Sequence, residues 1–246
     1  MAIASRLGAS RGREALGLAV MLLAGLASSP RGVDAQEPAK VPNTIEQRMQ
    51  ACAICHGKQG EGIQKNEYYP RLAGKPAVYL YNQLLNFRER RRDVPIMTYM
   101  VAYLSEPYLR EIAEYYANLH PPFPAPAAGA SKEVLARGEK LVTAGDPARE
   151  VPACAECHGK ALTGLLPAIP GIVGLNRDYI AAQMGGWKIG QRNAEAPDCM
   201  AQVAKRLTPE DIFAVTAWLA AQPASPDTPP APAESLRLPL KCGGVN

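Results

Sequence analysis

The amino-acid sequence predicts an all-α protein with two tandem domains, each built from three to four helices. The first observation behind this prediction is an internal repeat, because short motifs recur in the same order in both halves of the 246-residue chain, about 100 residues apart. The second is hydrophobic periodicity. Each half closes with apolar residues at helical spacing, and no segment alternates as a strand should over more than a few residues.

The repeat extends well beyond any single motif. Segment 70–74 matches segment 170–174, with a proline first and a glycine last in both, and segment 97–105 matches segment 200–208. Between them, a tyrosine, a glutamine and an arginine occupy matching positions: Tyr79 and Tyr179, Gln83 and Gln183, Arg92 and Arg192. The two halves are therefore expected to share one fold.

The first 35 residues have the pattern of a secretory signal. Arginines precede an apolar run over 16–27, and a small-residue cleavage site follows at 33–35. The apolar run of about 12 residues is short of the ~20 that a membrane span needs, although an uncleaved anchor is the alternative. We therefore expect a cleaved signal peptide and export across the inner membrane to the periplasm.

The mature chain is close to neutral and has no second long apolar stretch. Residues 36–246 carry 23 basic and 21 acidic side chains, a net charge of about +2. No basic patch signals a nucleic-acid partner. Because proline breaks helices, we expect an extended linker between the domains. The predicted organisation is signal peptide 1–35, N-terminal domain 36–120, Pro-rich linker 121–130, C-terminal domain 131–222 and Pro-rich tail 223–246.

Two CxxCH motifs predict that each domain binds one covalent c-type haem. The motifs occupy Cys52–His56 and Cys154–His158. On a helical turn the two cysteines, Cys52 with Cys55 and Cys154 with Cys157, share a face, so both sulfurs can form thioethers with one porphyrin. The adjacent His56 and His158 are then the proximal iron ligands.

Zinc binding and thiol redox chemistry are the alternatives for these motifs. A zinc ribbon places its two CxxC pairs about 15–20 residues apart, whereas these lie 102 residues apart. A thioredoxin-like motif expects a βαβ pattern, which the chain lacks. The only other histidine is His120, which we expect on the surface. With one spare histidine, bis-histidine ligation at both irons is excluded.

Two methionines are the candidates for the second axial ligand, an arrangement that raises the reduction potential. Met97 lies 41 residues after His56, and Met200 lies 42 residues after His158. Met100 competes in the first half, but its repeat partner is Val203, so the repeat selects Met97. Core packing is the alternative role for any methionine.

Prolines and arginines supply candidate groups around the haem. A ligating histidine usually donates its other ring N–H to an acceptor, and Pro70 and Pro170 could each present a carbonyl, with a simple turn as the alternative. The charged run 88–93 could neutralise haem propionates or face a partner, and a solvated helix end is equally compatible with it. Each domain of about 90 residues has a thin core of its own, so the porphyrin is expected to fill it.

Cys199 and Cys242 remain after the four haem-attaching cysteines are assigned. In an oxidising compartment an even remainder favours a disulfide, which would close a loop of about 44 residues. The alternatives are thiolate ligation of the iron by Cys199 and two free thiols.

With CxxCH, Pro-x-Leu-x-Gly, the segment from Tyr79 to Arg92, Met97 and the Leu104-Ser105 helix start in one order, residues 45–220 resemble the cytochrome c4 family. The resemblance implies two class I cytochrome c folds related by a pseudo-twofold axis, with the haem propionate edges facing each other. It also implies the thioether, axial and histidine-acceptor roles given above. The departures from the family are the missing counterpart of Gly138 in the first half, Cys199 and the long tail.

The resulting functional hypothesis is a periplasmic dihaem electron carrier, not an enzyme, with two covalent haem c groups. We expect single electrons to arrive from a quinol-oxidising complex or a dehydrogenase and to leave to a terminal oxidase. The alternatives are a cytochrome subunit docked on a periplasmic dehydrogenase and a dihaem peroxidase or thiosulfate-type oxidoreductase. Peripheral association with the membrane is left open.

Overall fold

The computed structural model describes residues 41–127 and 130–245. The predicted signal peptide 1–35 lies outside the described residues. Within them, no helix is both long and apolar enough to cross a membrane.

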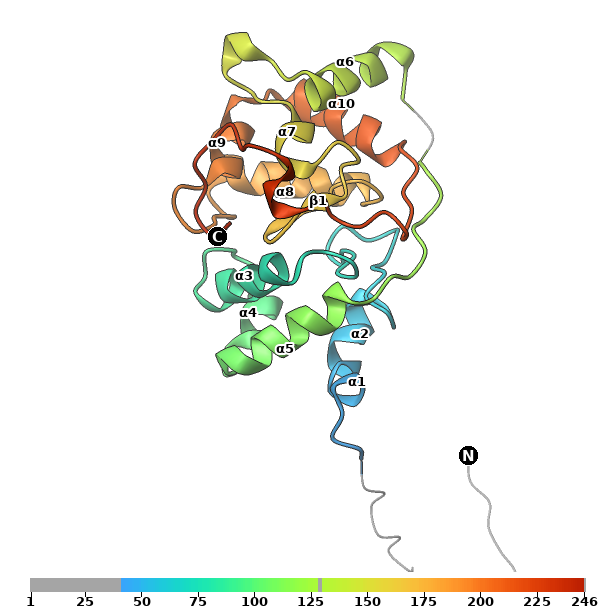
Figure 1. The fold of residues 1–246 in the computed structure, drawn as a ribbon, viewed down its shortest axis with the longest axis vertical. Helices are drawn as coiled ribbons and strands as arrows, with labels where there is room; N and C mark the ends of the chain where they lie inside the picture. The colour runs from blue at the N-terminus through green and yellow to red at the C-terminus, as the bar shows by residue number, and fades with distance from the viewer. Residues whose placement is uncertain (1–40, 128–129, 246) are drawn as a thin grey trace, which may run out of the picture. The chain divides into compact units, whose positions relative to one another are not determined.

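The described chain is mainly helical, as Figure 1 shows. The N-terminal half contains α1 (Ile45–Arg48), α2 (Gln50–His56), α3 (Ala77–Arg88), α4 (Pro95–Val101) and α5 (Glu106–Ala117). The C-terminal half contains α6 (Lys132–Thr143), the 3-10 turn η1 (Pro147–Arg149), α7 (Cys154–His158), β1 (Gly164–Leu165), β2 (Ile169–Pro170), α8 (Arg177–Ile189), α9 (Cys199–Arg206), α10 (Pro209–Ala220) and the 3-10 turn η2 (Ala233–Ser235).

Each half has its own hydrophobic cluster. In the N-terminal half, Leu109 of α5 is fully buried and packs with Leu80 of α3. In the C-terminal half, Val142 of α6 and Leu219 of α10 are buried in a second cluster. Two separate cores agree with a duplicated fold, whereas the domain boundaries 36–120 and 131–222 stay a prediction.

The sequence explains where the closing helices begin. Ser105 caps α5, and Thr208 caps α10 by accepting hydrogen bonds from backbone N–H groups in the first turn. A proline follows in the first turn of both helices, where its missing N–H costs nothing. These local signals place the same start at repeat-matched positions.

Each half has five α-helices within the described residues, more than the three to four expected. The first helical segment of the N-terminal half is divided at Met49, which ends α1 and begins α2. In the C-terminal half α6 is continuous, and Gly138 lets it approach α10 closely. A Cβ atom at Gly138 would lie 2.2 Å from the carbonyl oxygen of Ala214. Met49, at the division between α1 and α2, is buried in the N-terminal cluster.

A pair of two-residue strands also departs from the strand-free prediction. Strands β1 and β2 pair antiparallel, with Gly164 opposite Pro170. They are too short to leave an alternating pattern in the sequence. Their effect is to fold segment 164–170 back so that Pro170 faces the histidine of α7.

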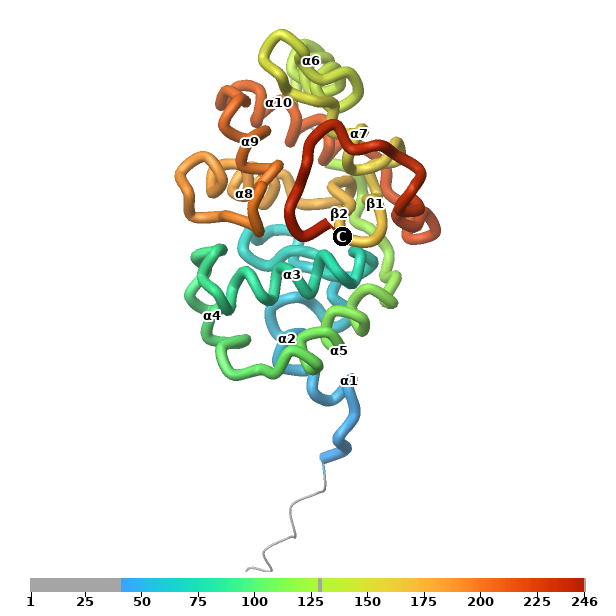
Figure 2. Tube along the Cα trace, turned by 60° about the vertical axis from the view of Figure 1, so that its left-hand side comes forward, coloured from blue at the N-terminus to red at the C-terminus, as the bar shows by residue number. Residues whose placement is uncertain are grey.

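The linker and the tail are packed against the helices. Arg71 donates hydrogen bonds to the carbonyl oxygens of Pro121 (2.5 Å) and Pro122 (3.0 Å) in the linker. Ala231 of the tail exchanges backbone hydrogen bonds with Gly164 and Leu166, at 2.9 and 2.8 Å. Figure 2 shows the tail in red, running past α7 and the β1–β2 pair. These contacts explain how Pro-rich segments without helix or sheet remain in place.

Candidate haem sites

Both proximal histidines stand at the last residue of a short helix. The Nδ1–H group of His56 donates to the Pro70 carbonyl oxygen at 3.0 Å, and that of His158 donates to the Pro170 carbonyl oxygen at 2.7 Å. Each helix ends because the next residue, Gly57 or Gly159, adopts a positive φ that favours glycine. A ring held through Nδ1 leaves Nε2 free to face a metal.

Burial acts on the charge state of both rings. It lowers the pKa of His56, against the opposing hydrogen bond to Pro70, and it lowers the pKa of His158 in the same way. Both histidines are 7% exposed. The neutral imidazole, which is the form that binds iron, is therefore favoured.

Three of the four CxxCH cysteines line the cavities next to these rings, whereas Cys55 lines none of these cavities. Cys52 and Cys154 each face a cavity, and Cys157 lines the cavities of the C-terminal half. Burial raises the pKa of Cys154 to about 12 and that of Cys157 to about 11. Within residues 41–127 and 130–245, no cluster of three or more His, Cys, Asp or Glu side chains could hold a metal ion.

The N-terminal cavity has a volume of about 280 Å³ and joins the predicted ligands. Cys52 and His56 line one side, and Met97 of α4 lines another. Met100, the competing methionine, is 36% exposed and does not line the cavity. The structure thus distinguishes the two methionines in the way that the repeat register does.

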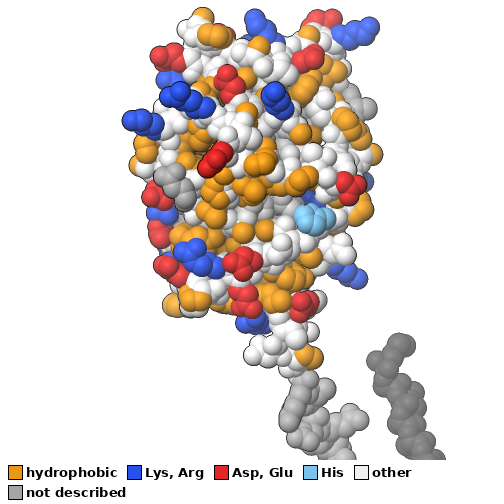
Figure 3. Space-filling model, in the orientation of Figure 1, with side chains coloured by type: hydrophobic (Ala, Val, Ile, Leu, Met, Phe, Trp, Pro, Cys, Tyr) orange, Lys and Arg blue, Asp and Glu red, His pale blue; other side chains and the backbone are white. Residues whose placement is uncertain are grey.

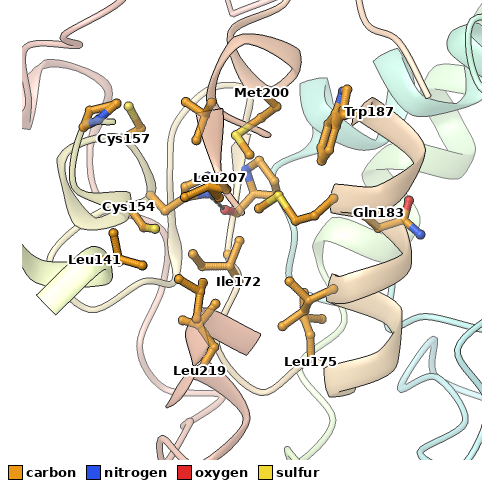
Figure 4. A pocket seen from close by; sticks show the side chains of 18 of the residues that line it. Leu141, Cys154, Cys157, Ile172, Leu175, Gln183, Trp187, Met200, Leu207 and Leu219 are labelled. Carbon is orange, nitrogen blue, oxygen red and sulfur yellow. Dashed lines mark hydrogen bonds between the residues drawn. The ribbon is translucent and has the colours of Figure 1, made fainter. Parts of the chain in front are cut away.

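The C-terminal site consists of two adjoining cavities of about 100 and 160 Å³. Cys157, His158 and Met200 line both. In Figure 4, Met200 of α9 points into the space between Cys157 and Trp187, and leucines form the floor of the site. Hydrophobic side chains also gather in the middle part of the face seen in Figure 3, with charged side chains around them.

One polar wall lies between the two sites. Arg92 donates to Gln83 in its own half at 3.0 Å and to Gln183 in the other half at 2.8 Å. Arg192 reciprocates, donating to Gln183 and also to Gln83 and Tyr79 at 3.4 Å. The backbones of Arg92 and Arg192 also pair, in an isolated antiparallel β-bridge. Residues that the repeat matched to one another therefore meet in space, as a pseudo-twofold relation requires.

This wall contains buried positive charge. Arg71, Lys75, Arg92 and Arg192 are each 5–8% exposed, and none forms an ion pair with a carboxylate among the described residues. Burial, together with the neighbouring Arg192, lowers the pKa of Arg92 to about 10. Buried cations of this kind are stable only beside an anion.

The residues present fit a haem c in each half. A CxxCH helix, a histidine with its second nitrogen bonded, and a methionine converge on an apolar cavity. The buried cations provide the complement for carboxylates, which the porphyrin carries as propionates. Within the charged run 88–93, Arg92 is buried between the two sites, whereas Arg88 and Arg91 contact carboxylates of the chain, Glu106 and Glu89.

Sequence reasoning did not assign Gln83, Gln183 or Lys75 to the site. The signal for the glutamines was present, because Gln83 and Gln183 occupy matching positions in the repeat. Lys75 left no repeat signal. His120 is exposed, as expected.

The remaining cysteines form a disulfide. Cys199 and Cys242 are bonded with their Cα atoms 5.4 Å apart. The disulfide prediction is confirmed, and it removes the alternatives of two free thiols and of thiolate ligation by Cys199. The disulfide brings the tail to the C-terminal site, where Cys242, Gly243 and Gly244 line the cavity of about 160 Å³ together with Met200.

Comparison with known proteins gives relatives along most of the chain. A search against models of protein families found no match. The thiosulfate dehydrogenase electron acceptor of Thiomonas intermedia is 40% identical over 179 residues, covering 72% of this chain and 80% of the relative. Cytochromes c4 from Pseudomonas aeruginosa and Thiocapsa roseopersicina are 30% and 31% identical, covering 68% of this chain and 82% and 85% of the relatives.

Solved structures give the same fold. Reduced cytochrome c4 from Pseudomonas stutzeri matches with a TM-score of 0.62 and 28% identity over 72% of this chain and 95% of that chain. The thiosulfate dehydrogenase TsdBA of Marichromatium purpuratum matches with a TM-score of 0.61 and 34% identity over 70% of this chain, which spans only 36% of that longer protein.

These relatives and the two sites agree on fold, cofactor and activity. The fold is two class I cytochrome c units, and the cofactors are two covalently bound haem c groups. The activity is electron transfer and not catalysis on a substrate. The chain belongs to the cytochrome c4 family of dihaem electron-transfer proteins.

Proposed function

We propose that this cytochrome is a periplasmic shuttle that takes single electrons from a thiosulfate-oxidising dehydrogenase and delivers them to a terminal oxidase. The observation that carries the proposal is the wall shared by the two haem sites. Six residues line cavities of both sites: Lys75, Tyr79, Gln83, Tyr179, Gln183 and Arg192. Two redox centres that share a wall can exchange electrons inside one protein, so that one centre can accept while the other donates.

The proposed iron ligands suit this role. Cys52, Cys55, Cys154 and Cys157 would hold the haems by thioethers, and His56, Met97, His158 and Met200 would be axial. With both axial positions taken by the protein, each haem supplies only a one-electron redox change. Pro70 and Pro170 would orient the histidines through the hydrogen bonds described above.

The donor follows from the comparison rather than from the fold. The relative from Thiomonas intermedia, at 40% identity, is named as an electron acceptor of thiosulfate dehydrogenase, whereas the relatives named cytochrome c4 are about 30% identical. This favours a dehydrogenase over a quinol-oxidising complex among the two donors that the sequence left open. Periplasmic location follows from the signal pattern of residues 1–35.

Stopped-flow reduction tests the donor. The oxidised protein is mixed with a purified thiosulfate dehydrogenase and thiosulfate, and in parallel with a quinol-oxidising complex and quinol. We expect the dehydrogenase to reduce both haems at least about tenfold faster than the complex does. Faster reduction by the quinol-oxidising complex would reject the proposed donor. Sequencing of the mature N-terminus after export tests cleavage after Ala35.

A further inference from the structure

Lys75 breaks the internal repeat at the wall between the haem sites. The matched segments 70–74 and 170–174 are followed by Lys75 in the first half and Leu175 in the second. Both side chains line haem-site cavities, but only the lysine lines those of both sites. A duplicated protein therefore has one ammonium group where symmetry would give two or none.

The ammonium group reaches across to the C-terminal site. Lys75 is 8% exposed, and its Nζ donates to the Gly171 carbonyl oxygen at 3.0 Å. Gly171 directly follows Pro170, whose carbonyl oxygen accepts the Nδ1–H of His158. A side chain of the N-terminal half thus binds the loop that orients the proximal histidine of the C-terminal half. Leu175 cannot return this contact, because it has no polar group.

Lys75 lies close to other titratable side chains at the boundary between the sites. Burial lowers the pKa of Lys75 to about 8, and Tyr179 opposes this effect while Arg71 and Arg192 add to it. The group therefore remains mainly protonated at neutral pH.

We propose that Lys75 biases the electron toward the C-terminal haem by raising its reduction potential more than that of the N-terminal haem. Reduction adds one negative charge to a haem site, and a fixed cation in a poorly solvated position stabilises the reduced form. Lys75 is a positioning residue, because it acts through the Gly171 carbonyl and through its field. The inference rests on the proposed haem positions but not on the proposed donor, since potentials are measured on the isolated protein.

The test is a redox titration of the isolated dihaem protein, followed by the paramagnetically shifted NMR signals of the haem methyl groups, which separate the two haems. In the half-reduced protein, Lys75→Gln and Lys75→Met should each shift the ratio of reduced C-terminal to reduced N-terminal haem by about threefold toward the N-terminal haem. Lys75→Arg keeps the charge and should keep the ratio of the unmodified protein.

Two results would overturn the proposal. If Lys75→Gln, which retains a hydrogen-bond donor, leaves the ratio unchanged while Lys75→Met shifts it, the residue has only a structural role. If the exposed Lys205→Gln on α9 shifts the ratio as much as Lys75→Gln does, the effect is one of net charge and not of position. Should Lys75→Met fail to fold, Lys75→Gln and Lys75→Arg still decide the question.

Discussion

At the scale of single residues, the repeat and the geometry select the same methionines. Met97 lines the cavity that holds His56, whereas Met100 of the same helix is exposed. Met97→Ala and Met200→Ala should each remove about half of the near-infrared charge-transfer band of methionine-ligated ferric haem and lower the potential of that haem. Met100→Ala should change neither quantity. If Met100→Ala removes half of this band and Met97→Ala does not, the alignment of the two repeats that selects Met97 is wrong.

A buried carboxylate stabilises the C-terminal half. Asp211 of α10 accepts hydrogen bonds from Arg137 of α6 at 2.7 Å and Arg149 of η1 at 2.6 Å, and it also caps its own helix through the Thr208 N–H. Burial alone would raise the pKa of Asp211, but these hydrogen bonds hold it well below its usual range. The repeat-matched position in the first half is Tyr108, so this anchor exists only once.

Asp211→Asn should lower the free energy of unfolding by about 2–3 kcal/mol at neutral pH, because it leaves two arginines without their carboxylate. This decrease in unfolding free energy is smaller than the one expected for a fully buried ion pair, because the side chains of Arg137 and Arg149 are partly exposed. The pKa of Asp211 is lower in the folded protein than in the unfolded protein, where it is near 4, so the ionised carboxylate stabilises the fold above about pH 4. This stabilisation is lost as the pH falls from about 4 toward the pKa of the folded state. The difference from the unmodified protein, measured by chemical unfolding, should therefore shrink below about pH 4. The exposed Asp227→Asn is the control and should show neither effect.

At the scale of elements, α6 and α10 approach each other only through a glycine. Gly138→Ala would place a methyl group 2.2 Å from the Ala214 carbonyl oxygen, so we expect a cost of about 1–3 kcal/mol. Gly185 of α8 is the matched control, because nothing lies within 4 Å of a Cβ at that position. Gly185→Ala should stabilise by up to about 1 kcal/mol. Thermal unfolding of the two variants should therefore shift in opposite directions, and equal shifts would contradict the close helix contact.

The disulfide ties the tail to the start of α9. Cys242→Ser should release residues 236–245 of the tail, which are otherwise held by hydrogen bonds such as that from Asn82 to the Gly244 carbonyl oxygen at 2.7 Å. Hydrogen exchange of residues 236–245 should accelerate. The C-terminal haem should lose its methionine band at a lower denaturant concentration than the N-terminal haem, since the loop constraint contributes up to about 4 kcal/mol. Cys199→Ser is the matched variant and should behave identically, and unchanged exchange in both would show that the tail is held without the bridge.

At the scale of the whole molecule, each half depends on its own haem, because the cavities lie within the two hydrophobic clusters. Cys154→Ser combined with Cys157→Ser should prevent covalent attachment in the C-terminal half and lead to its unfolding. Intact mass should fall from two haems to one, and limited proteolysis should cut within 131–222 while 45–120 resists. A fully protected C-terminal half without its haem would show that protein packing alone maintains it.

The chemistry of each site could be predicted from short stretches of sequence. A CxxCH motif, a proline 12 or 14 residues after its histidine and a methionine before a capped helix are local patterns, and the structure places residues of each around a cavity in each half. The disulfide followed from counting cysteines. The predicted number of helices was too low, because both halves contain short helices such as α1, α7 and α9, which leave little periodic pattern in the sequence.

The sequence by itself therefore determined the duplicated fold class and the class of protein, and it predicted a donor set for each site, because these follow from residue types at short spacings. Only the tertiary structure decided how the halves meet. It brought Arg92 to Gln183 and Arg192 to Gln83, and it placed Lys75 against Gly171. These contacts join segments about 100 residues apart, and their geometry depends on how two packed halves fit together. No local pattern encodes that fit. The sequence shows that Lys75 is matched to Leu175 in the repeat, but only the structure shows that Lys75 binds the Gly171 carbonyl oxygen of the other half.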